Sequence, residues 1–136
     1  RKPLDADKMH EAAQALLGEH DFTSFRARDC QANHPRRTMK DISVKRMGEW
    51  VMLEVCSNAF LYHMVRNIAG VLLPIGHGSK PVEWCKDVLE AKDRTKAGVT
   101  APGEGLYFVD VEYPEYPGLP IYREGPPFYQ LLQMKK

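Results

Sequence analysis

Residues 59–79 read Ala-Phe-Leu-Tyr-His-Met-Val-Arg-Asn-Ile-Ala-Gly-Val-Leu-Leu-Pro-Ile-Gly-His-Gly-Ser, and this stretch decides the fold because most of its circumference is apolar. At helical spacing, one broad face is covered by Phe60, Met64, Ile68, Val71, Leu72 and Ile75. The pattern predicts a buried helix that kinks or ends near Pro74, Gly76 and Gly78.

A narrow polar stripe runs along the same predicted helix. His63, Arg66, Asn67 and Gly70 stand at i, i+3, i+4 and i+7 and therefore share one side. An arginine in a buried helix is costly unless it meets a carboxylate, a phosphate or several carbonyls, because its guanidinium keeps its charge. Either Arg66 closes a structural ion pair with a neighbouring strand, or the stripe lines a cleft. Four positions in register favour the cleft.

The sequence on either side of this stretch predicts two more helices and a hairpin. Apolar residues at helical spacing predict a helix over 5–17, with Asp5 as its cap. From Thr38 the period changes to two, and with a turn at Gly48 this predicts an antiparallel hairpin that continues to Cys56. A third helix is expected to begin near Pro81.

A last strand is predicted at 106–113, where apolar and aromatic residues alternate. The fold class is therefore α+β, with helices packed on one face of an antiparallel sheet. Prolines at 114, 117, 120, 126 and 127 make a long strand unfavourable after that. We divide the chain into an α+β domain at 1–120 and a proline-rich tail or arm at 121–136.

Size and cysteine content bound the class of protein. With 136 residues the chain fits one domain, and its start at Arg1 suggests a fragment of a longer protein or a processed one. No run approaches the roughly 18 apolar residues of a membrane span, so we expect a soluble protein without a membrane partner. The three cysteines have no Cys-x-x-Cys spacing, which indicates neither a disulfide framework nor a zinc site and fits a reducing, cytoplasmic compartment.

Basic charge is concentrated between residues 26 and 46, where seven lysines and arginines meet two aspartates. Arg26 and Arg28 adjoin two phenylalanines, and Arg36 and Arg37 follow a proline-marked loop. Aromatic residues among arginines are typical of surfaces that follow a phosphate backbone. The phenylalanines fit a place in the core equally well, whereas the arginines favour nucleic acid.

No signature of hydrolysis or nucleotide binding stands out. His63 and His77 lack the spacing of a paired metal site, and Gly76-His77-Gly78 is not a phosphate-binding loop. The serines show no nucleophile-elbow context. Hydrolase, kinase and metal-dependent functions are therefore not predicted.

Four short motifs, taken together, resemble one enzyme family. They are Asp21-Phe22-Thr23-Ser24-Phe25-Arg26, Ala59-Phe60-Leu61-Tyr62-His63-Met64-Val65-Arg66-Asn67-Ile68, Ala91-Lys92-Asp93-Arg94-Thr95 and Glu104-Gly105-Leu106-Tyr107. In this order they closely resemble the C-terminal half of the tRNA pseudouridine synthase A family, over roughly residues 4–120. The resemblance implies an RRM-like, ferredoxin-like half of a homodimeric isomerase that needs no cofactor. Its substrate would be uridine in the anticodon stem-loop of tRNA, at tRNA positions 38 to 40, and the base must leave its stack to react.

The resemblance also assigns site residues. Arg66 matches the family arginine that pairs with the catalytic aspartate, and Leu106 matches the apolar residue that packs against the target uracil. Phe60, His63 and Asn67 match substrate-side positions near the cleft. We expect tRNA phosphates to be contacted by Arg26, Arg28, Arg36 and Arg37. A carboxylate beside a guanidinium stays ionised and oriented, as a nucleophile must be.

The family's aspartate lies upstream in a Gly-Arg-Thr-Asp-x-Gly motif, which does not occur in this chain, and neither does the motif of its active-site tyrosine. Asp93-Arg94-Thr95 is a different element. We therefore expect an N-terminal half to supply the nucleophile, and this chain to be inactive alone. Two alternatives stay open: a non-catalytic RNA-binding module in which Arg66 makes a structural ion pair, and a dimerisation domain whose central helix meets its copy.

Overall fold

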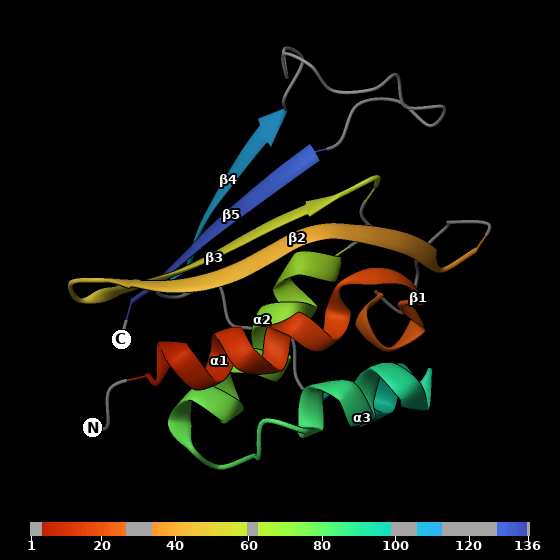
Figure 1. The fold of residues 1–136 in the computed structure, drawn as a ribbon, viewed down its shortest axis with the longest axis horizontal. Helices are drawn as coiled ribbons and strands as arrows, with labels where there is room; N and C mark the ends of the chain where they lie inside the picture. Colours follow the sequence, from red (N-terminus) through yellow and green to blue (C-terminus); the bar gives the residue numbers. More distant parts are fainter. Residues whose placement is uncertain (1–3, 27–33, 60–62, 99–105, 113–127, 136) are drawn as a thin grey trace.

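The computed structural model describes residues 4–26, 34–59, 63–98, 106–112 and 128–135, the last two ranges as backbone strands. Within these ranges the chain forms five strands, three α-helices and three short 3-10 turns. The helices lie together on one side of the sheet (Figure 1). This arrangement confirms the predicted α+β fold class.

One antiparallel sheet contains all five strands. They are β1 (Gly18–Asp21), β2 (Arg36–Met47), β3 (Trp50–Ser57), β4 (Leu106–Glu112) and β5 (Phe128–Lys135). Their spatial order is β1-β2-β3-β5-β4, so the last strand of the chain lies inside the sheet and β4 forms an edge. The predicted hairpin is confirmed as β2 and β3, which pair from Met39 with Ser57 to Met47 with Trp50.

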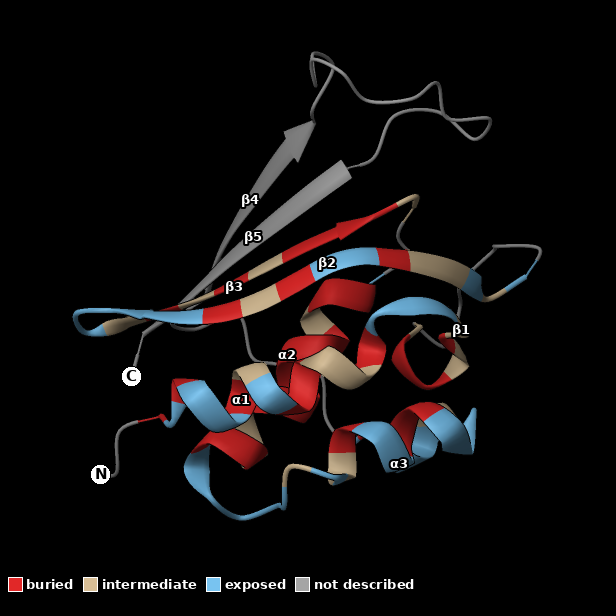
Figure 2. Ribbon diagram, viewed as in Figure 1, coloured by how far each residue is buried: buried red, intermediate tan, exposed pale blue. Residues whose placement is uncertain are grey.

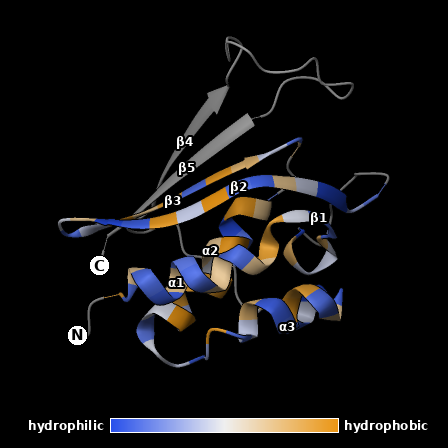
Figure 3. Ribbon diagram, viewed as in Figure 1, coloured by the Kyte–Doolittle hydropathy of each residue, from blue (hydrophilic) through white to orange (hydrophobic). Residues whose placement is uncertain are grey.

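The helical layer is built from α1 (Ala6–Ala13), α2 (Met64–His77) and α3 (Trp84–Ala91). The 3-10 turns are η1 (Gln14–Leu16), η2 (Thr23–Phe25) and η3 (Arg94–Lys96). Hydrophobic residues concentrate in α2, whereas α1 and α3 carry hydrophilic residues on their outer sides (Figure 3). No helix among the described residues is long and apolar enough to cross a membrane.

The core fills the space between the helices and one face of the sheet. Alternate residues of β3, namely Val51, Leu53 and Val55, are fully buried, as the period of two predicts. From the helical layer, α2 buries Met64, Val65, Ile68, Ala69, Val71, Leu72 and Ile75. Figure 2 shows the same division, with buried residues facing inward and exposed residues on the outer turns of α1 and α3.

The central helix begins later than the sequence predicts, at Met64 instead of residue 59. Its end at His77, followed by Gly78 in the left-handed region, agrees with the prediction. The delay has a physical cause in Ser57 and Asn58, whose side chains continue the strand pairing. The Asn58 Oδ1 accepts the Thr38 N–H at 2.9 Å, and the Ser57 hydroxyl donates to the carbonyls of Thr38 and Ala59.

The prediction of a tail or arm at 121–136 is wrong for residues 128–135. These residues form β5, which pairs with β3 on one side and with β4 on the other. The five prolines counted against a strand all precede Phe128, and the stretch from Phe128 to Met134 contains no proline or glycine. Its backbone is therefore free to donate to both neighbours. Residues 121–127 lie outside the described residues.

Two smaller differences concern the N-terminal third. The helix predicted over 5–17 is α-helical only to Ala13, and η1 completes it. Strand β1 was not predicted, because its Gly-Glu-His-Asp sequence lacks an apolar alternation. The left-handed Gly18, with φ of 96°, turns the chain from η1 into β1.

Candidate functional site

The predicted polar stripe begins at the start of α2. His63, the residue before the first turn, has a left-handed backbone with φ of 60°. Its side chain is exposed and forms no helix cap, while its carbonyl accepts the Asn67 N–H at 2.9 Å. A non-glycine residue keeps such a strained conformation only when its surroundings hold it. Other contacts must therefore fix this first turn.

The stripe runs from the surface into the interior. Arg66 is half-buried, Asn67 is 2% exposed, and Gly70 is buried. The four positions therefore do not line one open cleft along their length. His63 and Arg66 are the side chains of the stripe that reach the surface.

Asn67 lies at a junction of three segments. Its side-chain amide donates to the Phe25 carbonyl at 2.8 Å, and its Oδ1 accepts from Arg94 Nη2 at 3.1 Å. Arg94 Nη1 also donates to the Gly98 carbonyl at 2.7 Å. The family resemblance predicts that Asn67 contacts the substrate, and this contact stays a prediction; both ends of its amide make hydrogen bonds inside the protein. Its side chain ties α2 to η2 and η3.

Ser24 also links separate segments by hydrogen bonds, next to those of Asn67. Its buried hydroxyl donates to the Val88 carbonyl of α3 at 2.6 Å and accepts the Asp93 N–H at 2.8 Å. Three of the four motifs therefore meet in one hydrogen-bonded cluster. Neither Ser24 nor Arg94 is predicted as a site residue from the sequence, and their only signal there is that both lie inside these motifs.

Two Asp-x-Thr turns complete the cluster. Asp21 Oδ1 accepts from the backbone N and the hydroxyl of Thr23 at 2.9 and 2.6 Å, and Asp93 Oδ1 accepts from the same groups of Thr95 at 2.9 and 2.7 Å. Burial raises the pKa of Asp21, but the bonds from Thr23 and the nearby Lys92 and Arg36 outweigh it and lower the pKa. The bonds from Thr95, with help from Lys96, lower the pKa of Asp93.

A basic hollow of about 340 Å³ opens beside the approach to α2. It is lined by Glu19, His34, Arg36, Arg37, Thr38, Asn58 and Ala59. Arg36 forms an exposed ion pair with Glu19 at 3.4 Å, and Arg37 Nη1 donates to the carbonyls of His34 and Arg36. Arg37 Nε is buried without a hydrogen-bond partner among the described residues. The hollow therefore brings two arginines to one recess, and of the two it is Arg36 whose side chain is largely exposed.

Leu106 begins the edge strand β4, and the register places it level with Met134 and Val51. Val51 is six residues from Ser57 along β3, which corresponds to about 20 Å at the usual rise of a strand. The chain enters the α2 segment after Ser57. The strand pairing by itself therefore does not bring Leu106 beside Arg66, and its predicted contact with the uracil stays a prediction.

The remaining predicted residues are placed in part. Arg26 follows η2 and is half-buried, with its backbone N–H donating to the Thr23 carbonyl at 3.3 Å. It is adjacent to Phe25, whose carbonyl accepts from Asn67. Phe60 and Arg28 lie outside the described residues.

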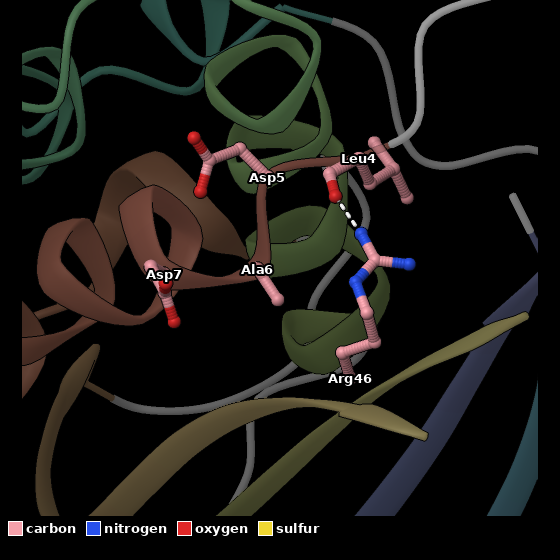
Figure 4. Close-up of a pocket in the computed structure, with 5 residues that line it drawn as sticks. All are labelled: Leu4, Asp5, Ala6, Asp7 and Arg46. Carbon is pink, nitrogen blue, oxygen red and sulfur yellow. Dashed lines mark hydrogen bonds between the residues drawn. The ribbon is translucent and has the colours of Figure 1, made fainter. Parts of the chain in front are cut away.

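A second hollow, of about 410 Å³, lies at the other end of β2. Figure 4 shows its lining, in which Arg46 donates a hydrogen bond to the Leu4 carbonyl beside the start of α1. Asp5 accepts the Lys8 N–H at 3.1 Å and so caps α1. The bond from Arg46 holds Leu4 onto β2, and none of the predicted site residues lines this hollow.

Other reactive groups offer little chemistry. Cys85 is buried in α3, where desolvation raises the pKa of its thiol to about 12, so it stays protonated at neutral pH. Within the described part of the chain, no group of three His, Cys, Asp or Glu side chains is placed to hold a metal ion.

Comparison with known proteins gives a consistent result. A family model described as tRNA pseudouridine synthase matches residues 12–114. The tRNA pseudouridine synthase A of Pseudoalteromonas atlantica is 59% identical over 125 residues, which make up 92% of this chain and 48% of that protein. The protein of the same name from Tolumonas auensis is 58% identical over 124 residues, or 91% and 48%. That from Shewanella amazonensis is 54% identical over 125 residues, or 92% and 48%. The chain spans about half the length of these curated relatives.

Proposed function

The chain belongs to the tRNA pseudouridine synthase family, and from this premise we propose that it is the C-terminal half of an enzyme that isomerises uridine to pseudouridine in the anticodon stem-loop of tRNA, at positions 38 to 40. The observation that carries the proposal is the meeting of three family motifs at the start of α2, directly beside Arg66. The matched relatives are about twice as long as their aligned part, which supports an N-terminal half as the partner of this chain.

The reaction breaks the bond between N1 and the ribose C1′ and forms a bond between C5 and the same carbon. A proton leaves C5 and N1 gains one, so atoms balance without a cofactor. In this proposal the N-terminal half supplies the aspartate nucleophile, and Arg66 keeps that carboxylate ionised and oriented. The place of Arg66, half-buried in the first turn of α2, supports this role.

Contacts to tRNA are proposed for the basic hollow. Arg36 and Arg37 line it together with His34 and Thr38, and its rim at Asn58 and Ala59 leads directly into the motif that contains Arg66. A phosphate there would meet the exposed guanidinium of Arg36 and would weaken its pair with Glu19. Arg26 and Arg28 extend the proposed surface, with Phe60, His63 and Leu106 closer to the base. We also propose a homodimer and a cytoplasmic location, both on the family resemblance.

Tritium release from tRNA labelled at uracil C5 tests the proposal. We expect release by this chain joined to the N-terminal half found in its relatives, and none by this chain alone. Release by neither, with tRNA still bound, would favour the non-catalytic RNA-binding module. In the joined protein Arg66→Lys should abolish release but hardly change the Kd for tRNA, since Lys keeps the charge but loses the paired geometry. Equal losses in both measurements would argue against an orienting role.

Charge reversal tests the basic hollow separately. Replacing Arg36 and Arg37 by Glu should weaken tRNA binding and reduce its dependence on salt, because fewer counterions are released. The matched control carries Lys8→Glu and Lys86→Glu, which change the net charge equally at exposed positions of the helical layer. Equal effects of the two pairs would refute a specific phosphate contact at the hollow.

A further inference from the structure

We propose that Asn67 and Arg94 are positioning residues that fix the direction of Arg66 at the start of α2. The inference rests on the proposed function for its catalytic meaning, although the geometry that it asserts is a property of this chain. The effect of Asn67 and Arg94 passes through the backbone turn that carries Arg66.

The start of α2 lacks the usual means of fixing a helix. Its N-cap residue, His63, provides no side-chain cap and is held in a left-handed conformation. Serine, threonine, aspartate or asparagine at this position normally accepts a backbone N–H of the first turn and sets the direction of entry. The nearest side chains that could serve that purpose, Ser57 and Asn58, are engaged with Thr38 and Ala59 instead.

Asn67, a residue of the first turn itself, fixes the direction of the helix start instead of a capping residue. Its backbone N–H closes the first turn onto the His63 carbonyl at 2.9 Å, and its side chain binds the Phe25 carbonyl at 2.8 Å. The backbone bond would form with any residue except proline at this position, whereas the side-chain bond to Phe25 restrains the rotation of the turn about the helix axis. Because Arg66 is the adjacent residue, a rotation of this turn would displace its guanidinium. With Asn67 2% exposed, water does not readily replace the bond to Phe25.

Arg94 locks the other end of the same amide. It donates to Asn67 Oδ1 at 3.1 Å and to the Gly98 carbonyl at 2.7 Å, so its guanidinium bridges α2 and the segment after η3. The orientation of the amide is then determined, because only its oxygen can face Arg94 while its nitrogen faces Phe25. Arg94 is itself held by η3, which Asp93 caps and Ser24 anchors to α3.

The side-chain NMR signal of Arg66 tests this geometry without any need for activity. The chain is labelled with nitrogen-15 at arginine, and Arg66→Lys identifies the Arg66 Nε signal. We expect Asn67→Ala and Arg94→Ala to shift or broaden that signal, and Arg94→Lys to do so less. Leu89→Ala removes buried side-chain volume from α3 and is the control for general loosening. An Arg66 signal unchanged by Asn67→Ala, or changed equally by Leu89→Ala, would overturn the inference.

The joined enzyme gives the second readout. In single-turnover assays, Asn67→Ala and Arg94→Ala should each slow the chemical step by about 10- to 100-fold, the size expected when a catalytic group is misplaced by about 1 Å. The tRNA Kd should change less than about threefold, and the double variant should be no slower than the slower single one. Additive losses, or losses in the Kd alone, would contradict positioning. If the wild-type enzyme releases no tritium, the proposed function fails, while the NMR signal still decides the geometry.

Discussion

Gly76 of α2 lies against Met9 of α1, and replacing it by alanine tests how tightly the helical layer is packed. A Cβ at this position would lie 2.6 Å from Met9 Sδ, 2.9 Å from Met9 Cγ and 3.1 Å from Leu4 Cδ2. Ordinary contacts between such atoms are about 3.5–4.0 Å. The Met9 side chain, which is fully buried, must therefore move by about 1 Å.

Two opposing terms set the size of the effect. Alanine is favoured over glycine inside a helix by about 0.5–1 kcal/mol. Overpacking a buried site costs about 1–3 kcal/mol, and here the displaced side chain has no exposed direction in which to move. We therefore expect Gly76→Ala to lower the free energy of unfolding by about 1 kcal/mol, the balance of the two terms.

Urea denaturation, followed by far-ultraviolet circular dichroism, measures this free energy in a double-mutant cycle. Met9→Ala alone should cost about 2–5 kcal/mol. In the Gly76→Ala background it should cost at least about 1 kcal/mol less, because the new methyl group fills part of the cavity. The control cycle pairs Gly76→Ala with Met39→Ala, a buried methionine on β2 that is not among the nearest contacts of Gly76. Additivity at Met9, or a stabilising Gly76→Ala, would refute the close approach.

Two further predictions concern the turns around the candidate site. Lys92 follows α3 in the left-handed region with φ of 50°, so Lys92→Gly relieves about 1–2 kcal/mol of strain and costs about 0.5–1 kcal/mol of backbone entropy. The free energy of unfolding should therefore rise by about 0.5–1 kcal/mol, whereas Lys92→Ala, which keeps the strain, should not raise it. The same denaturation assay checks this, and equal effects of the two variants would contradict it. The pKa values of Asp21 and Asp93 are lowered in the folded chain, so the unfolded chain binds their protons more tightly. The stability that they contribute should be present at neutral pH and be lost as the pH falls through these lowered pKa values. A pH series on the Asp21→Asn, Asp93→Asn double variant should show a flatter acid limb, and an unchanged limb would argue against the two turns.

The elements with a clear period were predictable because one physical rule governs each of them. The hairpin of β2 and β3 follows from alternation, and the apolar face of α2 is buried as its spacing predicts. The errors occur where side chains compete with that rule. Ser57 and Asn58 look like helix caps in the sequence, but they extend the strand pairing and delay α2 by five residues.

Strand β5 shows a different limit. Its neighbours β3 and β4 are separated by about fifty residues in the sequence, and it enters the sheet between them. The prolines before Phe128 dominate the local composition. The residues around β5 contain no information on whether β3 and β4 each have an edge with which it can pair. Pairing between distant segments is decided by the whole sheet and cannot be read from a window of residues.

The candidate site also contains residues that could be predicted from the sequence and residues that could not. The identity of Arg66 as a charged residue on an apolar helix was visible in the sequence, because a guanidinium in that setting demands a partner. The role of Asn67 was not, since an amide on the same stripe fits a cleft or a junction equally well, and only burial with two engaged ends distinguishes them. The contact that identifies a junction is the bond from Arg94, which lies 27 positions after Asn67 in the sequence. A site residue that acts on substrate can be recognised from its own chemistry, whereas one that acts through a neighbour is defined by contacts that only the fold creates.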